Sequence, residues 1–169
     1  MTRFALRLPN HQARLVALAV SYHMSRPGSE IDHETLSEYE HGLAEVLPVI
    51  DGQLNQESAT IELSPLQTML LSGAFSAVIS ELKMYSMLDT MAGASHRPRS
   101  TAPGFDDRLR VLFPEIAGDP SYASRLAEEM TLLRRQVPST RAREIVEADR
   151  KAAQEAARAR RKPWQFWKR

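Results

Sequence analysis

The sequence predicts an all-α protein, a compact helical bundle built around a long central helix at about residues 65–91. Three observations support this prediction. Apolar residues recur with a helical period nearly throughout the chain. The motif Ser64-Pro65-Leu66-Gln67 is a strong helix start, and an alanine-rich, highly charged segment follows Pro138. With 43% hydrophobic and 25% charged residues, the 169-residue chain has the composition of one globular domain with an appendage.

Two helices are expected before the central one. Asn10 can cap a helix that runs to about residue 24 and ends at the Arg26-Pro27-Gly28 turn. Its apolar side comprises Leu15, Val16, Leu18, Ala19 and Tyr22. A second helix is expected over residues 32–47, where Pro48 should force the stop because proline lacks a backbone N–H. Its apolar face would be Leu36, Tyr39, Leu43, Val46 and Leu47.

The central helix is apolar around most of its circumference. One broad side holds Leu66, Leu70, Ala74, Ala77, Val78, Tyr85 and Leu88, and this side is extended by Leu71, Phe75, Ile79 and Leu82. Only a narrow polar seam remains, made of Thr68, Ser72, Ser76, Lys83 and Thr90. Such a helix must be covered on several sides, so it is expected at the centre of the bundle. The methionines are interpreted as core filler, namely Met69, Met84, Met87, Met91 and Met130.

The second half of the chain continues the helical pattern after a loop. Residues 93–104 contain two prolines and lack periodicity, so they are expected to form that loop. A short helix at 105–113 should follow, and then one that starts at Asp119 and Pro120. Beyond Pro138 the apolar stripe is mostly alanine, so the last helix is expected to protrude. The predicted division is a helical bundle domain at 1–137 and a basic helical arm at 138–169.

Two pairs of segments suggest an internal duplication. Residues 4–12 resemble residues 59–67, since each is an alternating apolar stretch that runs into a helix with glutamine at the same place. Residues 43–52 can be laid on 109–118, with Leu, Pro, Ile and Gly at identical spacing. A real duplication implies two helical hairpins and a short two-stranded ribbon. The alternatives are chance similarity of helix ends, and strands that only staple the helix starts.

The sequence offers little evidence of catalysis. With no cysteine, thiol nucleophiles and cysteine zinc sites are excluded, and there is no glycine-rich phosphate loop. The Glu-x-x-His spacings at 30–33 and 38–41 resemble those of di-metal bundles, but both lie in one continuous segment. A solvated polar face is the preferred interpretation. We therefore predict no catalytic residue, metal, cofactor or small-molecule ligand, and expect a protein that is not an enzyme.

The chain ends in a basic and aromatic run, which is the predicted contact site. From Arg141 onward the net charge is +6, so that residues 1–140 have a net charge of −5. Such an arm on an acidic body indicates an anionic partner. The predicted contact residues are Arg158, Arg160, Arg161, Lys162, Trp164, Phe166, Trp167, Lys168 and Arg169.

The leading prediction is a noncatalytic helical interaction protein whose basic aromatic run contacts the cytoplasmic face of a membrane. The short apolar stretch at 15–20 is not a secretory signal, so a cytoplasmic protein, peripheral at the inner membrane face, is expected. The alternatives are nucleic-acid binding, in which arginines contact phosphates and Trp or Phe stacks on bases, and a protein–protein adaptor with a flexible tail. A homodimer through the small-residue seam Ser72, Ser76 and Ser80 is the minority alternative to packing within one chain.

Overall fold

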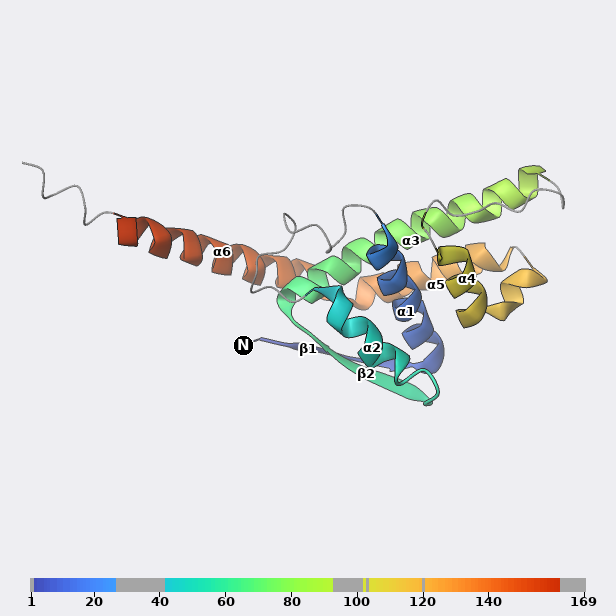
Figure 1. Cartoon of the computed structure of the whole chain (residues 1–169), viewed down its shortest axis with the longest axis horizontal. Coiled ribbons are helices and arrows are strands. Elements are labelled where there is room, and N and C mark those ends of the chain that lie inside the picture. Colours follow the sequence, from blue (N-terminus) through green and yellow to red (C-terminus); the bar gives the residue numbers. More distant parts are fainter. Residues whose placement is uncertain (1, 27–41, 93–101, 103, 120, 162–169) are drawn as a thin grey trace, which may run out of the picture.

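A computed structural model describes residues 2–26, 42–92, 102, 104–119 and 121–161 (Figure 1). The described chain is mostly helical, as predicted, and contains a two-stranded antiparallel sheet, so its architecture is not purely α-helical. The elements in order are β1 (Phe4–Pro9), α1 (Asn10–Ser25), the 3-10 helix η1 (Leu43–Glu45), α2 (Val46–Asp51), β2 (Ser58–Leu63), α3 (Pro65–Ala92), α4 (Phe105–Leu112), the 3-10 helix η3 (Pro114–Ala117), α5 (Tyr122–Gln136) and α6 (Ser139–Arg161).

The two strands pair as the ribbon that the sequence allows. Phe4 is paired with Leu63, Leu6 with Ile61 and Leu8 with Ala59. Side chains alternate across the ribbon, since one face is directed at the core and the other is exposed. The buried members are Leu8, Ala59, Ile61 and Leu63. Each strand leads directly or within two residues into a long helix, β1 into α1 and β2 into α3.

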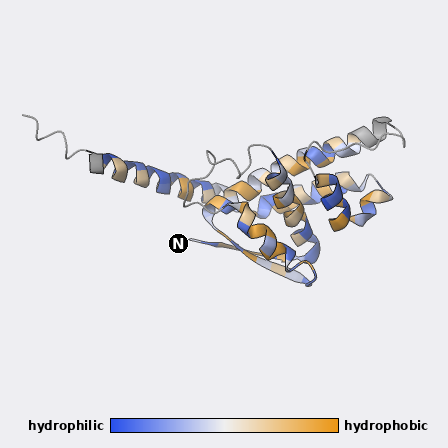
Figure 2. Cartoon of the chain, in the orientation of Figure 1, coloured by the Kyte–Doolittle hydropathy of each residue, from blue (hydrophilic) through white to orange (hydrophobic). Residues whose placement is uncertain are grey.

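Helix α1, rather than α3, is the element covered on all sides. Residues 15–20 are all buried, which is more than one full helical turn. The helix packs against α2, α3, α4 and α5 and against both strands. Alanines at positions 13, 17 and 19 permit these close approaches because they add little volume. Figure 2 shows hydrophobic residues distributed through all the helices of the body.

Helix α3 is the longest helix of the body, but part of its surface is open. It packs against α1, α5 and α6 through a buried side that includes Leu71, Phe75, Val78 and Leu82. Met84 and Met87 are exposed, which corrects the interpretation of both as core filler, whereas Met130 is fully buried as expected. The polar seam of α3 is also narrower than predicted. Thr68 is fully buried, and its hydroxyl donates a hydrogen bond of 2.8 Å to the Ser64 carbonyl.

The small-residue seam of α3 has a partner within the chain. The guanidinium of Arg134, on α5, donates a hydrogen bond of 2.7 Å to the Ser76 hydroxyl. The hydroxyls of Ser76 and Ser80 in turn donate to the carbonyls four residues earlier, at 3.0 and 3.1 Å. Packing against α5 therefore accounts for part of the seam, in line with the interpretation that was preferred over a homodimer.

The start of α3 forms the predicted capping box. The Gln67 side-chain oxygen accepts a hydrogen bond from the Ser64 N–H at 2.9 Å, and the Ser64 hydroxyl accepts one from the Gln67 N–H at 3.1 Å. The Gln67 side-chain nitrogen also donates to the Gly42 carbonyl at 3.1 Å. The buried Gln67 side chain thus links the beginning of α3 to the segment before η1.

Two local predictions were wrong. Asn10 begins α1 but makes no side-chain cap; its side-chain nitrogen instead donates to the carbonyls of Leu54 and Gln56, the latter at 2.8 Å. Pro48 does not end a helix, because it lies in the first turn of α2. Proline is tolerated there since the N–H groups of a first turn have no partner within the helix. The other residues expected in that second helix, 32–41, lie outside the described residues.

The later elements agree with the predictions in type and place. Helix α4 lies where a short helix was expected, and α5 buries Leu126, Met130 and Leu133. The Asp119 carboxylate accepts hydrogen bonds from the Ser121 hydroxyl, from Arg125 at 2.8 Å and from the Ser121 N–H at 3.0 Å, and these bonds lower the pKa of that carboxyl. Most of the predicted loop at 93–104 lies outside the described residues.

Replacing Phe75 should test the core. Phe75 is fully buried on α3, so Phe75→Ala should lower the free energy of unfolding by about 3–5 kcal/mol in urea denaturation. Met84→Ala is the matched control on the same helix, because that side chain is 52% exposed and its removal should cost less than about 1 kcal/mol. Equal losses for the two variants would contradict the assignment of the buried side.

Candidate functional site

Helix α6 carries the predicted contact run away from the body. Ala142 and Val146 are buried and pack with α3, and Ile145 is half-buried. Residues 147–159 are all exposed, and Figure 1 shows this part of the helix projecting beyond the other elements. Because its first two turns belong to the packed body, the projecting arm begins after Val146 rather than at Pro138.

The structure describes only part of the predicted contact set. Arg158 is exposed near the end of α6. Arg160 and Arg161 belong to the helix, although their side chains lie outside the described residues. The remaining members are also outside the described part of the chain, namely Lys162, Trp164, Phe166, Trp167, Lys168 and Arg169.

The sequence of the arm favours a helix even without packing against the body. Alanine has the highest helix propensity, and Ala148, Ala152 and Ala156 recur every fourth residue. Glu147 and Lys151 are spaced four apart, an arrangement that stabilises exposed helices. Figure 2 shows hydrophilic residues alternating with weakly hydrophobic ones along this part of the helix. The arm therefore has the properties of a rigid spacer rather than of a packed element.

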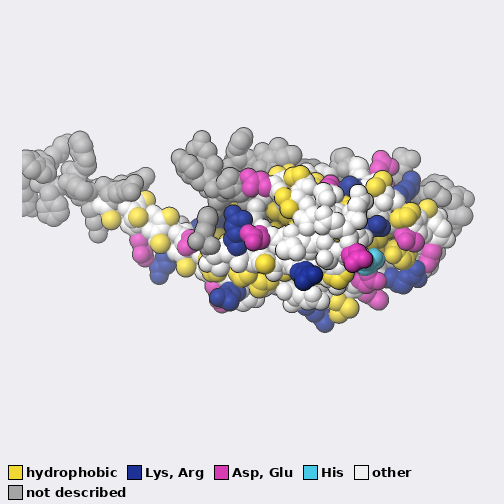
Figure 3. All heavy atoms as spheres, turned by 90° about the horizontal axis from the view of Figure 1, so that it is seen from below, with side chains coloured by type: hydrophobic (Ala, Val, Ile, Leu, Met, Phe, Trp, Pro, Cys, Tyr) yellow, Lys and Arg dark blue, Asp and Glu magenta, His cyan; other side chains and the backbone are white. Residues whose placement is uncertain are grey.

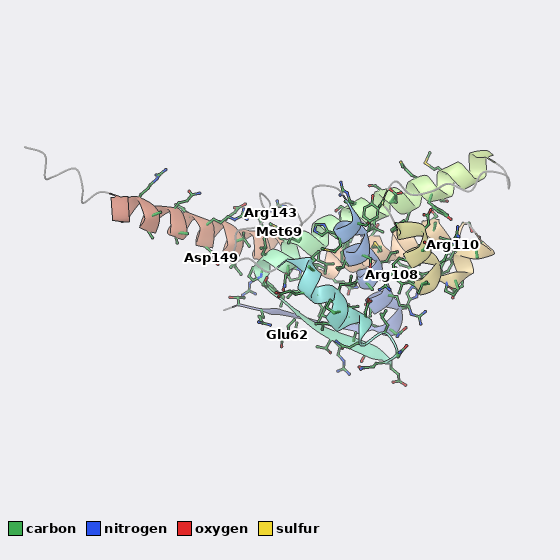
Figure 4. The ribbon with its side chains drawn as sticks, viewed as in Figure 1. Glu62, Met69, Arg108, Arg110, Arg143 and Asp149 are labelled. Carbon is green, nitrogen blue, oxygen red and sulfur yellow. The ribbon has the colours of Figure 1, made fainter. Side chains whose placement is uncertain are left out.

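A cavity of about 370 Å³ lies where the arm leaves the body. Its walls come from the ribbon, from η1 and α2, from the capping box of α3 and from α6. Figure 4 shows Glu62 on β2 and Asp149 on α6, which both line it. The apolar lining comprises Val46, Val49, Ile61, Pro65, Leu66 and Val146.

The charges around this cavity largely compensate one another. Arg3 and Glu62 form an exposed ion pair at 3.5 Å, and the other charged lining residues are Glu45, Asp149 and Arg150. Among the described residues the lining thus holds three carboxylates and two guanidinium groups, and no histidine, lysine or tyrosine. Sequence patterns do not predict this cavity, because residues from four separate segments form it. Of its lining, only the capping box of Ser64 and Gln67 was recognisable from the sequence, and there as a helix start.

One buried ionisable pair lies in the core. The Tyr22 hydroxyl, on α1, donates a hydrogen bond of 3.0 Å to the carboxylate of Glu81 on α3, and both residues are buried. Burial raises the pKa of Tyr22 above its usual value, and the hydrogen bond and negative charge of Glu81 add to this. The Arg26 guanidinium lies 5.8 Å from the centre of the Tyr22 ring and acts in the opposite direction.

Metal binding finds no support in the described residues, where no three histidine or carboxylate side chains gather closely enough to hold an ion. The two Glu-x-x-His spacings, at 30–33 and 38–41, lie outside them. Elsewhere, His11 contacts Glu129 and so links α1 to α5 at the surface. This pair is an isolated surface contact.

The charge distribution on the body is mixed. On the face shown in Figure 3, basic and acidic side chains are interspersed, and neither sign covers a continuous area. No helix within the described ranges combines the length and the hydrophobicity needed to cross a membrane. Comparison with known proteins adds no further indication: no family model, curated protein or solved structure matches this chain.

Truncation should locate the boundary of the arm. A chain ending at Lys151 should melt at the temperature of the full chain, because residues 147–159 are exposed. A chain ending at Pro138 loses the buried Ala142 and Val146 and uncovers part of α3, so its free energy of unfolding should fall by about 2 kcal/mol or more. Equal melting temperatures for the two truncated chains would contradict a stabilising role for the first two turns of α6.

Alkaline titration should report the buried tyrosine. Because its pKa is raised on folding, Tyr22 favours the folded state fully below the unfolded value of about 10, and this contribution is lost as the pH rises through the folded pKa. Tyr22→Phe should be less stable than wild type at pH 7 by about 1–3 kcal/mol, since Glu81 loses a donor. In denaturation curves the difference should shrink above pH 10. A constant difference would show that Tyr22 titrates normally.

Proposed function

We propose that this protein is a noncatalytic helical interaction protein that uses the basic aromatic run at residues 158–169 to contact an anionic surface, in the first place the cytoplasmic face of a membrane. The observation that supports this function is the exposure of every residue from 147 to 159 on α6. At 1.5 Å per residue, the helix from Glu147 to Arg158 places the start of the run about 17 Å beyond the packed body.

The composition of the run suits a membrane surface. Each lysine or arginine near an anionic leaflet contributes about 1 kcal/mol, and the run contains six of them. Trp164, Phe166 and Trp167 add aromatic rings, which favour the headgroup region. The arm itself exposes only alanine as an apolar residue, so it would serve as a spacer and leave anchoring to the run. A protein of this kind would be cytoplasmic and peripheral at the inner face.

Nucleic-acid binding through the same run is the second candidate. Arginines would contact phosphates, and the tryptophans would stack on unpaired bases. The mixed charge of the body argues against it, because binding domains usually spread positive charge over a folded face. An adaptor with a merely flexible tail is the third candidate, and it predicts binding to neither surface.

We also retain the internal duplication as a proposal, limited to the two strand–helix units. Under the 55-residue offset Leu6 corresponds to Ile61, and these two residues are paired with each other in the ribbon. This pairing would put a pseudo-twofold axis at the middle of the ribbon. The helices beyond α1 and α3 do not support the proposal. A twofold relation would pack α2 against α1 and α4 against α3, but α2 and α4 both pack against α1.

Vesicle co-sedimentation tests the membrane proposal. The full chain should bind vesicles that contain phosphatidylserine, bind neutral phosphatidylcholine vesicles weakly, and dissociate as salt is raised, because charge attraction is screened. Deleting residues 158–169 should abolish binding. A second variant, with Trp164, Phe166 and Trp167 all changed to serine, keeps the charge and should bind at least tenfold more weakly.

Tryptophan fluorescence of the full chain, measured while vesicles or an oligonucleotide are added, distinguishes membrane binding from nucleic-acid binding. Both tryptophans lie in the run, so a change on adding anionic vesicles reports membrane contact directly. Stronger quenching by a single-stranded oligonucleotide than by vesicles would replace the membrane with nucleic acid. Equal vesicle binding by the deleted chain would refute a role of the run altogether.

A further inference from the structure

The outer edge of β2 is closed by a side chain. The Thr60 N–H donates a hydrogen bond of 2.9 Å to the Gln53 side-chain oxygen, and the Gln53 side-chain nitrogen donates one of 3.2 Å to the Thr60 carbonyl. In an antiparallel pair each residue directs its N–H and its C=O to the same side. The backbone N–H and C=O of Thr60 therefore point away from β1, and those of its partner Arg7 must point away from β2.

The opposite edge, that of β1, is open. By alternation along the strand, Ala5 faces outward with Arg7. Pro9 belongs to the same set, and a proline fits there because no ladder hydrogen bond needs its missing N–H. Ala5 and Arg7 are exposed, and no described residue hydrogen-bonds to their backbone groups. The edge thus offers two N–H and two C=O groups in strand geometry.

The side chains along this edge select the charge of a partner. Arg7 is exposed and forms no ion pair within the described residues. Arg3 is 63% exposed and makes only the 3.5 Å contact with Glu62. Opposite charges directly across a strand pair are stabilising and like charges are destabilising. An added strand with a carboxylate opposite Arg7 would therefore be favoured.

We propose that the free edge of β1 binds an extended acidic segment of another protein by strand addition, with an aspartate or glutamate opposite Arg7. A second copy of this chain fits less well. No antiparallel register of two β1 strands places a carboxylate opposite Arg7: pairing centred on Ala5 places Arg3 opposite it, pairing centred on Leu6 places Ala5 there, and pairing centred on Arg7 sets the two Arg7 side chains against each other. The basic run at 158–169 carries the same charge as the edge, so it is also disfavoured.

The probe is a blocked heptapeptide of alternating glutamate and valine, titrated into the full chain and followed by amide exchange in NMR spectra. Before addition the Ala5 and Arg7 amides should exchange quickly, whereas those of Leu6 and Leu8, which face β2, should be protected. The peptide should slow exchange at Ala5 and Arg7. Ala5→Pro should weaken binding at least tenfold, and it should leave the ribbon paired because the N–H of Ala5 faces outward.

A charge exchange provides a control that does not depend on tolerance of a proline. Arg7→Glu should weaken binding of the glutamate peptide about tenfold and improve binding of a lysine–valine peptide of the same length. Absence of binding by the glutamate peptide, equal affinity of wild type for both peptides, or affinity unchanged in both variants would overturn the proposal. Concentration-dependent protection of the Ala5 and Arg7 amides without peptide would also overturn it, in favour of a second copy.

Discussion

Pairing of β1 with β2 is the constraint on which the rest of the fold depends. The two strands are separated by about 50 residues of sequence, and each leads into one of the two helices that build the core. The Asn10 N–H donates to the Glu57 carbonyl at 2.9 Å and so continues the contact into the first residue of α1. Because the pairing fixes both helix starts, it also determines how α1 and α3 meet at Tyr22 and Glu81.

The segment between α2 and β2 reinforces this pairing with neutral side chains. Gln53 satisfies both backbone groups of Thr60, and Asn10 satisfies the carbonyls of Leu54 and Gln56. The Gln53 amide takes the place of a third strand beside Thr60, since it supplies the acceptor and the donor that a neighbouring strand would offer. The outer edge of β2 is therefore satisfied at Thr60 without a further strand.

Local motifs predicted their own structure well, and long-range contacts decided the rest. The capping box at Ser64 and Gln67 needs only four consecutive residues, so the sequence alone identified it. Asn10 looked like a helix cap, yet its role depends on Leu54 and Gln56, which are distant in sequence. The alanine-rich start of α6 looked wholly exposed, because a pattern of small residues does not show whether α3 lies against Ala142 and Val146. The cavity was unpredictable for the same reason, as it draws its walls from four segments. The predicted contact run is beyond this comparison, since Arg158 is its only member with a described side chain.

The amide of Gln53 on Thr60 also sets a limit on assembly. A two-stranded sheet normally has two open edges, and repeated addition at both edges can grow without end into a fibre. Here one edge is occupied at its middle by a residue of the same chain, with α2 packed alongside β2. Each molecule therefore has one sheet edge, that of β1, at which another strand can pair. Any association through its sheet stops at a single closed pair and cannot propagate.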